Sequence, residues 1–240
     1  MLKIFEDKLK LAEAFCEVLL QLNRRKERLF LVLSGGNMPK TIFQVLVNNY
    51  NSKINWSKVH IFWGDERCVQ PDDDESNYGM TKKYLLDFIE IPGENVHRIE
   101  GENNPESEIV RYSEEIKKFV PLKNDLPVFD LMMLGIGEDG HIASIFPDQM
   151  RLLDSHKMCA AAFHPASGQK RITLTGRVIN NSERIIFLIT GKKKADVIKK
   201  ILIQKNKILP AEFIKPAEGS LSYFIDSEAA ALLDKKGITT

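Results

Sequence analysis

The sequence predicts an α/β fold, with a mostly parallel sheet and helices on both faces in a Rossmann-like three-layer sandwich. Two observations support this prediction. Apolar runs of strand length alternate along the chain with segments whose apolar residues recur every three or four positions, as in amphipathic helices. Several of the apolar runs also end in glycine turns, which parallel strands would bring to one edge of the sheet. The turns at that edge are therefore the first place to look for a site.

The length and composition are those of an ordinary globular protein. At 240 residues, the chain is long enough to bury a substantial core, and we expect one domain over residues 1–240. Hydrophobic residues make up 43% and charged residues 28%, which argues against extensive disorder. The formal net charge of +1 indicates neither a nucleic acid nor an anionic membrane as partner. Any anion site must therefore be local.

Cysteine usage and the N-terminal residues bear on the compartment. Cys16, Cys68 and Cys159 are odd in number, widely spaced and form no Cys-x-x-Cys pair. This pattern is typical of free thiols in a reducing compartment rather than of a disulfide framework or a zinc knuckle. The first ten residues are rich in charge, and no window of the sequence is long and apolar enough to span a bilayer. We expect a cytoplasmic monomer that binds neither membrane nor nucleic acid.

The first third of the chain pairs an apolar run with a glycine turn. A helix is expected over residues 7–22, followed by a strand at 29–33 and a helix that opens near Pro39 and runs to about residue 49. The strand leads directly into Ser34-Gly35-Gly36. Such a strand, turn and helix can point backbone N–H groups at an anion or an oxyanion. Most glycine pairs are only tight turns, so the motif alone does not decide between the two readings.

A second strand, expected over residues 58–63, delivers a charged tripeptide. Asp65-Glu66-Arg67 follows it directly, which suits a site for a charged or polyhydroxyl ligand, although such a tripeptide is also common in solvated loops. The acidic run at 72–75 lacks the ligand spacing of a calcium loop. We interpret it as a solvated loop leading to a helix at 78–88, capped by Ser76 or Asn77.

The remaining elements continue the alternation, and no internal repeat interrupts them. Three lysines begin one predicted helix, where they oppose the helix dipole unless an anion is bound; solvated surface lysines are the alternative. The expected elements are a short strand at 95–99, a helix at 107–119, a loop at 121–127, strands at 171–175 and 184–190, a helix from 191 to about 203, a turn or short helix at 210–213, a strand at 221–225 and a terminal helix at 226–233.

The most informative stretch is 130–147, an apolar run that ends in Gly135-Ile136-Gly137 and then presents Asp139 and His141. We expect a buried strand, a glycine turn and a helix that begins near His141 and favours its neutral imidazole. A neutral imidazole can take a proton from water, and a nearby carboxylate can orient the ring. No Gly-x-Ser-x-Gly elbow or His-Glu-x-x-His motif is present, so the sequence favours water as the nucleophile, no metal and no cofactor.

The predicted topology gathers these groups at one sheet edge. The other four histidines, at positions 60, 97, 156 and 164, receive no role, because a lone histidine is more often structural than catalytic. The edge is expected to collect Gly35, Gly36, Asp65, Arg67, Asp139, His141 and Lys194.

These motifs together resemble the 6-phosphogluconolactonase family. The resemblance covers nearly the whole chain in order. The motifs that carry it are Ser34-Gly35-Gly36 with Pro39, Asp65-Glu66-Arg67 followed by Ser76-Asn77, the run from Gly135 to Pro147, Arg171-Ile172-Thr173, the run from Gly191 to Lys194, and the segment from Leu209-Pro210-Ala211 to Asp226.

The resemblance implies metal-independent hydrolysis of 6-phospho-D-glucono-1,5-lactone in the oxidative pentose phosphate pathway. It implies that His141 is the general base, with Asp139 as its orienting neighbour. The Gly35-Gly36 turn would face the developing oxyanion or the sugar hydroxyls. Asp65 would contact the substrate, and Arg67, Arg171 and Lys194 are the candidates for the 6-phosphate, since a dianion needs convergent cations.

Two alternatives remain. The glucosamine-6-phosphate deaminase family shares the fold and the Asp-Gly-His turn, but it carries Asp-Glu-Tyr in place of the tripeptide ending in Arg67. It also places a catalytic glutamate five residues after its histidine, where this chain has Phe146. Phenylalanine cannot transfer a proton, so the sequence favours the lactonase. A non-catalytic sugar-phosphate-binding module is the second alternative, because binding residues alone do not establish turnover.

Overall fold

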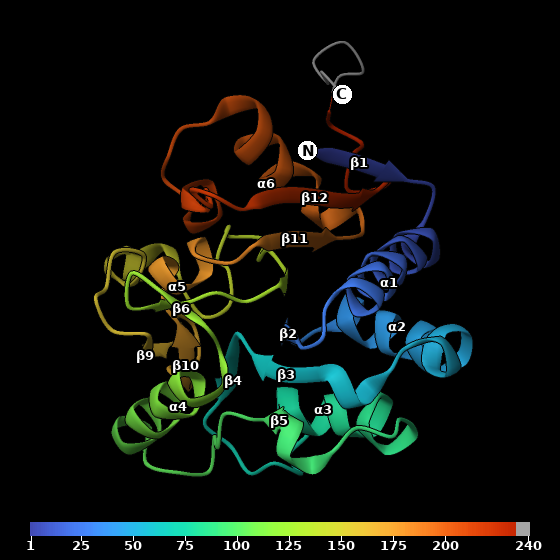
Figure 1. Cartoon of the computed structure of the whole chain (residues 1–240). Helices are drawn as coiled ribbons and strands as arrows, with labels where there is room; N and C mark the ends of the chain where they lie inside the picture. Colours follow the sequence, from blue (N-terminus) through green and yellow to red (C-terminus); the bar gives the residue numbers. More distant parts are fainter. Residues whose placement is uncertain (234–240) are drawn as a thin grey trace.

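The computed structural model describes residues 1–233, and a seven-stranded sheet forms its centre (Figure 1). Each neighbouring pair of strands in this sheet is parallel, in the order β1-β12-β11-β8-β2-β3-β5. The strands are β1 (Leu2–Phe5), β2 (Leu29–Leu33), β3 (Val59–Trp63), β5 (Val96–His97), β8 (Leu131–Leu134), β11 (Arg184–Ile189) and β12 (Ser220–Asp226). The predicted strands at 29–33, 58–63, 184–190 and 221–225 are confirmed to within a residue or two at each end, and the short strand at 95–99 is confirmed as β5.

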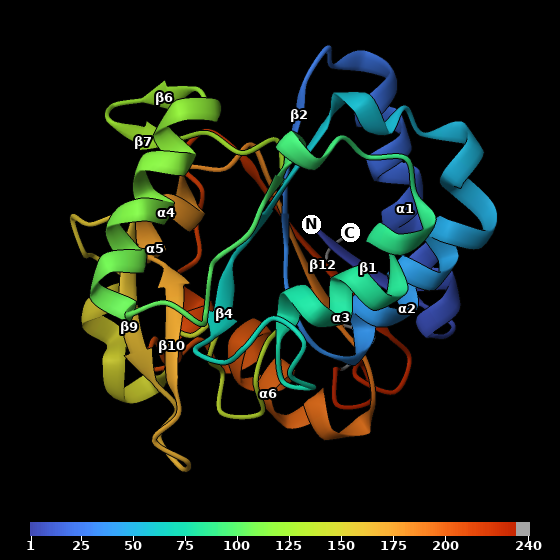
Figure 2. The same ribbon diagram turned by 90° about the horizontal axis from the view of Figure 1, so that it is seen from below.

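Layers cover both faces of the sheet, as predicted. Figure 2 shows α1 (Lys8–Arg25), α2 (Asn37–Val45) and α3 (Asn77–Tyr84) on one face, and α4 (Pro105–Phe119) and α5 (Gly176–Asn180) on the other. The helix α6 (Ala195–Lys199) follows β11. The predicted α/β sandwich is therefore confirmed.

A second, three-stranded sheet was not expected. It consists of β4 (Asp65–Arg67), β10 (Lys170–Leu174) and β9 (Cys159–Phe163), with both pairs antiparallel. The predicted strand at 171–175 is confirmed as β10, but it belongs to this small sheet rather than to the central one. The tripeptide at 65–67, expected as a turn, is itself a strand that pairs with β10. A short hairpin, β6 (Leu122–Lys123) and β7 (Leu126–Pro127), lies within the predicted loop at 121–127.

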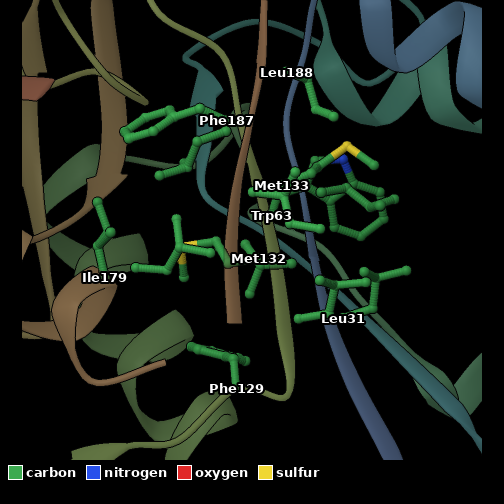
Figure 3. Close-up of a cluster of buried hydrophobic side chains, with 14 of the residues drawn as sticks. Leu31, Trp63, Phe129, Met132, Met133, Ile179, Phe187 and Leu188 are labelled. Atoms are coloured by element: carbon green, nitrogen blue, oxygen red, sulfur yellow. The ribbon is translucent and has the colours of Figure 1, made fainter. Parts of the chain in front are cut away.

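The core centres on β8, whose four residues are all buried. Figure 3 shows Phe187 and Leu188 of the neighbouring strand β11 pointing to opposite sides of the ribbon, toward the two covering layers. Because both faces of the sheet are covered, its central strands read as continuous apolar runs rather than as alternating patterns. This burial explains why the run at 130–134 was recognisable as a strand.

Three further details differ from the sequence-based expectation. The helix predicted at 226–233 is wrong, because turns follow β12 there. The carboxylate of Asp226 accepts hydrogen bonds from the backbone N–H groups of Gly191 and Ala229 instead of capping a helix. Neither β1 nor β9 was predicted. No helix within residues 1–233 has the length and apolar character needed to cross a membrane.

Two buried histidines, which received no role from the sequence, pair inside the core. Nδ1 of His60 lies 3.0 Å from Nε2 of His97, whose Nδ1 lies 2.7 Å from a carboxylate oxygen of Glu115. Burial, the charge of His97 and the charge of Arg28 lower the pKa of His60 to about 4, against a weaker opposing effect of Glu94. The folded protein therefore holds His60 neutral well below pH 6.

We expect this pair to make the fold acid-sensitive. A base whose pKa is lowered by folding takes up its proton first in the unfolded chain, so stability falls as the pH drops through the interval from about 6.5 to about 4. Burial of His60 should contribute roughly 2 kcal/mol to the loss of unfolding free energy between pH 7 and pH 4.5. Urea unfolding of the wild type and of His60→Gln at both pH values measures this contribution. An equal loss in the two proteins would contradict it.

Candidate active site

A cavity opens at the carboxyl ends of β2 and β8, where the strand order changes direction. From β2 the chain continues to β3 on one side, and from β8 it continues to β11 and β12 on the other. Such a switch point leaves a crevice at the edge of a parallel sheet. The cavity has a volume of about 360 Å³.

The structure brings most of the predicted site residues to this cavity. Segments far apart in the chain contribute to it because the turns after β2, β3, β8 and β11 meet at one edge, as expected. Of the eight predicted residues, seven line the cavity, namely Gly35, Gly36, Asp65, Arg67, His141, Arg171 and Lys194. The eighth, Asp139, lies behind His141 and contacts its ring.

His141 and Asp139 form a hydrogen-bonded pair at the cavity. Nδ1 of His141 lies 2.6 Å from Oδ1 of Asp139, and the same oxygen accepts the backbone N–H of His141 at 3.2 Å. The expected helix at His141 is wrong. Residues 142–145 instead form a tight turn, in which Ile142 and Ile145 pair by backbone hydrogen bonds and Ala143 has a φ of 47°. The turn, rather than a helix N-terminus, places the imidazole.

The electrostatics of the pair select one tautomer of the imidazole. Partial burial raises the pKa of Asp139, but the hydrogen bond from His141 and its charge outweigh this effect and lower the pKa below its usual value. The ionised carboxylate can only accept hydrogen bonds, so the ring hydrogen of a neutral His141 resides on Nδ1. Nε2 then carries the lone pair and can act as a base.

Gly137 leaves the space in which this pair fits. A Cβ at this position would lie 2.1 Å from Nδ1 of His141 and 2.4 Å from Oδ1 of Asp139. We therefore expect Gly137→Ala to displace the pair and to lower kcat about a hundredfold, since misplacement of a catalytic group by about 1 Å can cost that much. Steady-state kinetics checks this, with Gly93→Ala as the control, because a Cβ there meets no atom within 4 Å. Equal activity of the two variants would contradict the prediction.

Two arginines form the cationic end of the cavity. Arg67 of β4 and Arg171 of β10 are direct cross-strand partners, so their side chains share one face of the small sheet. Each Nε is buried without a hydrogen-bond partner in the described structure, and among residues 1–233 neither guanidinium pairs with a carboxylate. Burial and the charge of Arg67 lower the pKa of Arg171, and the charges of Asp65, Glu75 and Glu66 oppose this. Two half-buried cations side by side, without a carboxylate in ion-pair contact, form a site for an anion.

Lys194, in the segment after β11, adds a third cation to the cavity. It lines the cavity, whereas Lys192 and Lys193 are exposed, so the structure separates Lys194 from its two neighbours. Burial lowers the pKa of Lys194, and the nearby charges of Glu138 and Asp139 oppose this.

Asp65 is held by two residues for which the sequence predicted no role in the site. Its Oδ2 accepts a hydrogen bond of 2.7 Å from Oγ of Ser144, which is fully buried, and its backbone carbonyl accepts one of 2.9 Å from Nδ2 of Asn77. Asn77 packs so closely against Gly35 that a Cβ added to Gly35 would lie 1.8 Å from Oδ1 of Asn77. Only the position of Ser144 in the 135–147 motif could have indicated its involvement.

Glu66 anchors the strand that carries Asp65 and Arg67. Its carboxylate accepts backbone N–H groups of Asn77 and Tyr78 at the start of α3, at 2.8 and 2.7 Å. Burial raises the pKa of Glu66 to about 6, although these hydrogen bonds oppose the shift. The predicted cap is confirmed, since Oγ of Ser76 accepts the N–H of Gly79.

Phe146 packs against both His141 and Arg171. Its fully buried ring lies 4.7 Å from the ring of His141 and 5.9 Å from the guanidinium carbon of Arg171. No carboxylate occupies this position. Within residues 1–233, no three His, Cys, Asp or Glu side chains lie close enough together to hold a metal ion.

Comparison with known families agrees with this geometry. The family model described as glucosamine-6-phosphate isomerases/6-phosphogluconolactonase matches residues 7–223. The chain belongs to this family. Because the description of this family names two activities, family membership alone does not decide the reaction.

Three similar proteins are each named 6-phosphogluconolactonase. A 6-phosphogluconolactonase of Haemophilus influenzae is 44% identical over 204 residues, which cover 84% of this chain and 86% of that protein. A 6-phosphogluconolactonase of Treponema pallidum is 39% identical over 207 residues, which cover 86% of each. The crystal structure of the Thermotoga maritima 6-phosphogluconolactonase, 30% identical, superimposes with a TM-score of 0.82 over 95% of this chain and 99% of that one.

Proposed function

We propose that this protein hydrolyses 6-phospho-D-glucono-1,5-lactone to 6-phospho-D-gluconate by general-base activation of water, without a metal ion. One observation carries the proposal: a histidine oriented by a carboxylate and a pair of arginines without a carboxylate partner line the same cavity. A substrate for such a cavity needs an electrophilic carbon at one end and an anion at the other. A phosphorylated sugar lactone has both.

The reaction begins at His141. Its Nε2 removes a proton from a water molecule as the water oxygen attacks the lactone carbonyl carbon, and Asp139 stabilises the imidazolium that forms. The resulting tetrahedral oxyanion collapses with cleavage of the bond between this carbon and the ring oxygen. The imidazolium returns the proton to the departing ring oxygen, which becomes a hydroxyl group. The Gly35-Gly36 turn lines the cavity and is our candidate for stabilising the oxyanion.

The phosphate is held at the other end of the cavity. Arg67 and Arg171 bind its oxygens from one sheet, and Lys194 approaches from the loop after β11. The carboxylate of Asp65, which Ser144 fixes in place, is positioned to accept a hydrogen bond from a sugar hydroxyl. Binding energy from the phosphate thus orients the lactone carbon toward the base.

Two observations favour the lactonase over the deaminase. The buried ring of Phe146 can neither donate nor accept a proton, so no proton-transfer group stands where the deaminase family carries its glutamate. The relatives from Haemophilus influenzae and Treponema pallidum, which match most of the chain, are named 6-phosphogluconolactonase.

A paired assay tests the proposal. Purified protein should release acid from freshly prepared 6-phospho-D-glucono-1,5-lactone in a pH-stat, after the spontaneous rate is subtracted, and should release no ammonia from glucosamine 6-phosphate. Ammonia release without lactone hydrolysis would replace the lactonase by the deaminase. Tight binding of 6-phosphogluconate with no acceleration of either reaction would favour a binding module.

We further propose that residues 1–240 act as one domain and as a monomer in the cytoplasm, within the oxidative pentose phosphate pathway. The cavity supports a single domain that acts as a monomer, because every residue assigned to the reaction comes from one chain. Analytical ultracentrifugation of the active protein measures the oligomeric state, and a sedimenting dimer that loses activity on dilution would contradict the proposal.

A further inference from the structure

The two arginines at the cationic end are held by a bridge that joins two loops. Nη1 of Arg67 donates a hydrogen bond to the backbone carbonyl of Glu75, and Nη2 of Arg171 donates one of 3.0 Å to Oε1 of Gln169. The two acceptor residues are themselves connected, because Nε2 of Gln169 donates to Oε2 of Glu75 at 2.8 Å. The bridge spans 94 positions in the chain.

The chemistry of the acceptors distinguishes this bridge from an ordinary ion-pair network. The two arginines are held by a carbonyl and an amide, both of which accept a hydrogen bond without carrying charge. A carboxylate in the place of Gln169 would pair with Arg171 and compete with a bound dianion. The bridge therefore fixes the direction of the guanidinium groups and leaves their charge available.

The position of Gln169 in the hairpin between β9 and β10 supports this role. Gln169 lies directly before β10 and two residues before Arg171, and its side chain reaches the guanidinium of Arg171. Its own backbone carbonyl accepts the N–H of His164, which closes the hairpin and fixes the start of β10. The amide thus reaches Arg171 from one side and the loop that contains Glu75 from the other.

We propose that Gln169 is a positioning residue that aligns Arg67 and Arg171 for the substrate phosphate through its bridge to Glu75. The inference rests on the proposed function of the cavity, because it assumes that a phosphate occupies the cationic end. Gln169 does not line the cavity and makes no hydrogen bond with His141. Its removal should therefore weaken phosphate binding and leave the chemical step intact.

The test compares two substitutions on two substrates. Gln169→Ala should raise KM for 6-phospho-D-glucono-1,5-lactone about tenfold with kcat within about twofold, since a hydrogen bond to a charged group is lost. Gln169→Glu should raise KM further, to about thirtyfold, because its carboxylate pairs with Arg171. For unphosphorylated D-glucono-1,5-lactone, kcat/KM should stay unchanged in both variants. Gln70→Ala is the matched control, because Gln70 is exposed and its side chain makes no hydrogen bond within the described structure.

Each outcome decides between the inference and its alternatives. Equal losses of kcat/KM on both lactones would assign Gln169 a merely structural role. An unchanged KM of Gln169→Glu for the phosphorylated lactone would contradict the proposed role of the bridge. If the wild type hydrolyses neither lactone, the proposed function fails, and calorimetric titration with inorganic phosphate then tests the bridge alone. Phosphate binding by Gln169→Glu as tight as that of the wild type would overturn the inference.

Discussion

Replacing His141 by alanine is expected to lower kcat for 6-phospho-D-glucono-1,5-lactone roughly a thousandfold, which is the usual contribution of a positioned general base. KM should change little, because we assign the phosphate to other residues of the cavity, Arg67, Arg171 and Lys194. The measurement is the initial rate of acid release in a pH-stat, corrected for spontaneous hydrolysis. His156→Ala is the matched control, since His156 is exposed and contacts Arg177 outside the cavity.

The neighbouring carboxylate sharpens this prediction. Asp139→Asn keeps the shape of the side chain, but its amide group can donate a hydrogen bond to Nδ1 of His141 and so place the ring hydrogen on Nε2. That tautomer cannot accept a proton from water, so we expect a loss of at least a hundredfold in kcat. Wild-type turnover in either His141→Ala or Asp139→Asn would remove His141 from the mechanism.

The second large effect concerns the cationic end. Arg171→Met keeps an apolar stem over the ring of Phe146 and removes only the guanidinium. We expect kcat/KM for the phosphorylated lactone to fall roughly a hundredfold, which is the size of a lost charge-assisted contact to phosphate. The unfolding temperature should not fall, because the variant also removes a like charge beside Arg67 and a buried Nε without a partner.

Controls for this variant come from the same strand. Lys170→Ala changes an exposed neighbour on β10 and should leave the kinetics unchanged. Arg171→Lys should recover only part of the activity, because an ammonium group cannot bind two phosphate oxygens in the planar geometry of a guanidinium. Full activity of Arg171→Met on the phosphorylated lactone would show that the phosphate binds elsewhere.

Much of the site could be predicted from the sequence because its signals are local. Each of the turns after β2, β3 and β8 follows an apolar run directly, and parallel strands bring such turns to one edge. The alternation of strands and helices therefore predicted the sheet edge at which the structure places Gly35, Arg67 and His141. Burial of the strands on both faces made these runs easy to recognise.

Other features depend on contacts between distant residues, which local patterns do not record. The pairing of β4 with β10 joins Arg67 to Arg171 across more than a hundred residues, and neither short strand carries a signal for its partner. The hydrogen bond between Ser144 and Asp65 spans 79 positions. The helix expected at His141 failed for a similar reason. The turn there is held by backbone pairing and by packing of Leu209 against Gly140, a contact between segments remote in the sequence.

The ratio of kcat/KM for the phosphorylated and unphosphorylated lactones tests most directly whether the cavity has a base at one end and a phosphate site at the other. The ratio is to be measured in parallel for the wild type, His141→Ala and Arg171→Met. The account predicts that His141→Ala loses the same factor on both substrates and keeps the wild-type ratio, whereas Arg171→Met loses activity on the phosphorylated lactone alone and lowers the ratio. A ratio that falls in His141→Ala, or that survives in Arg171→Met, would contradict the assignment of the two ends.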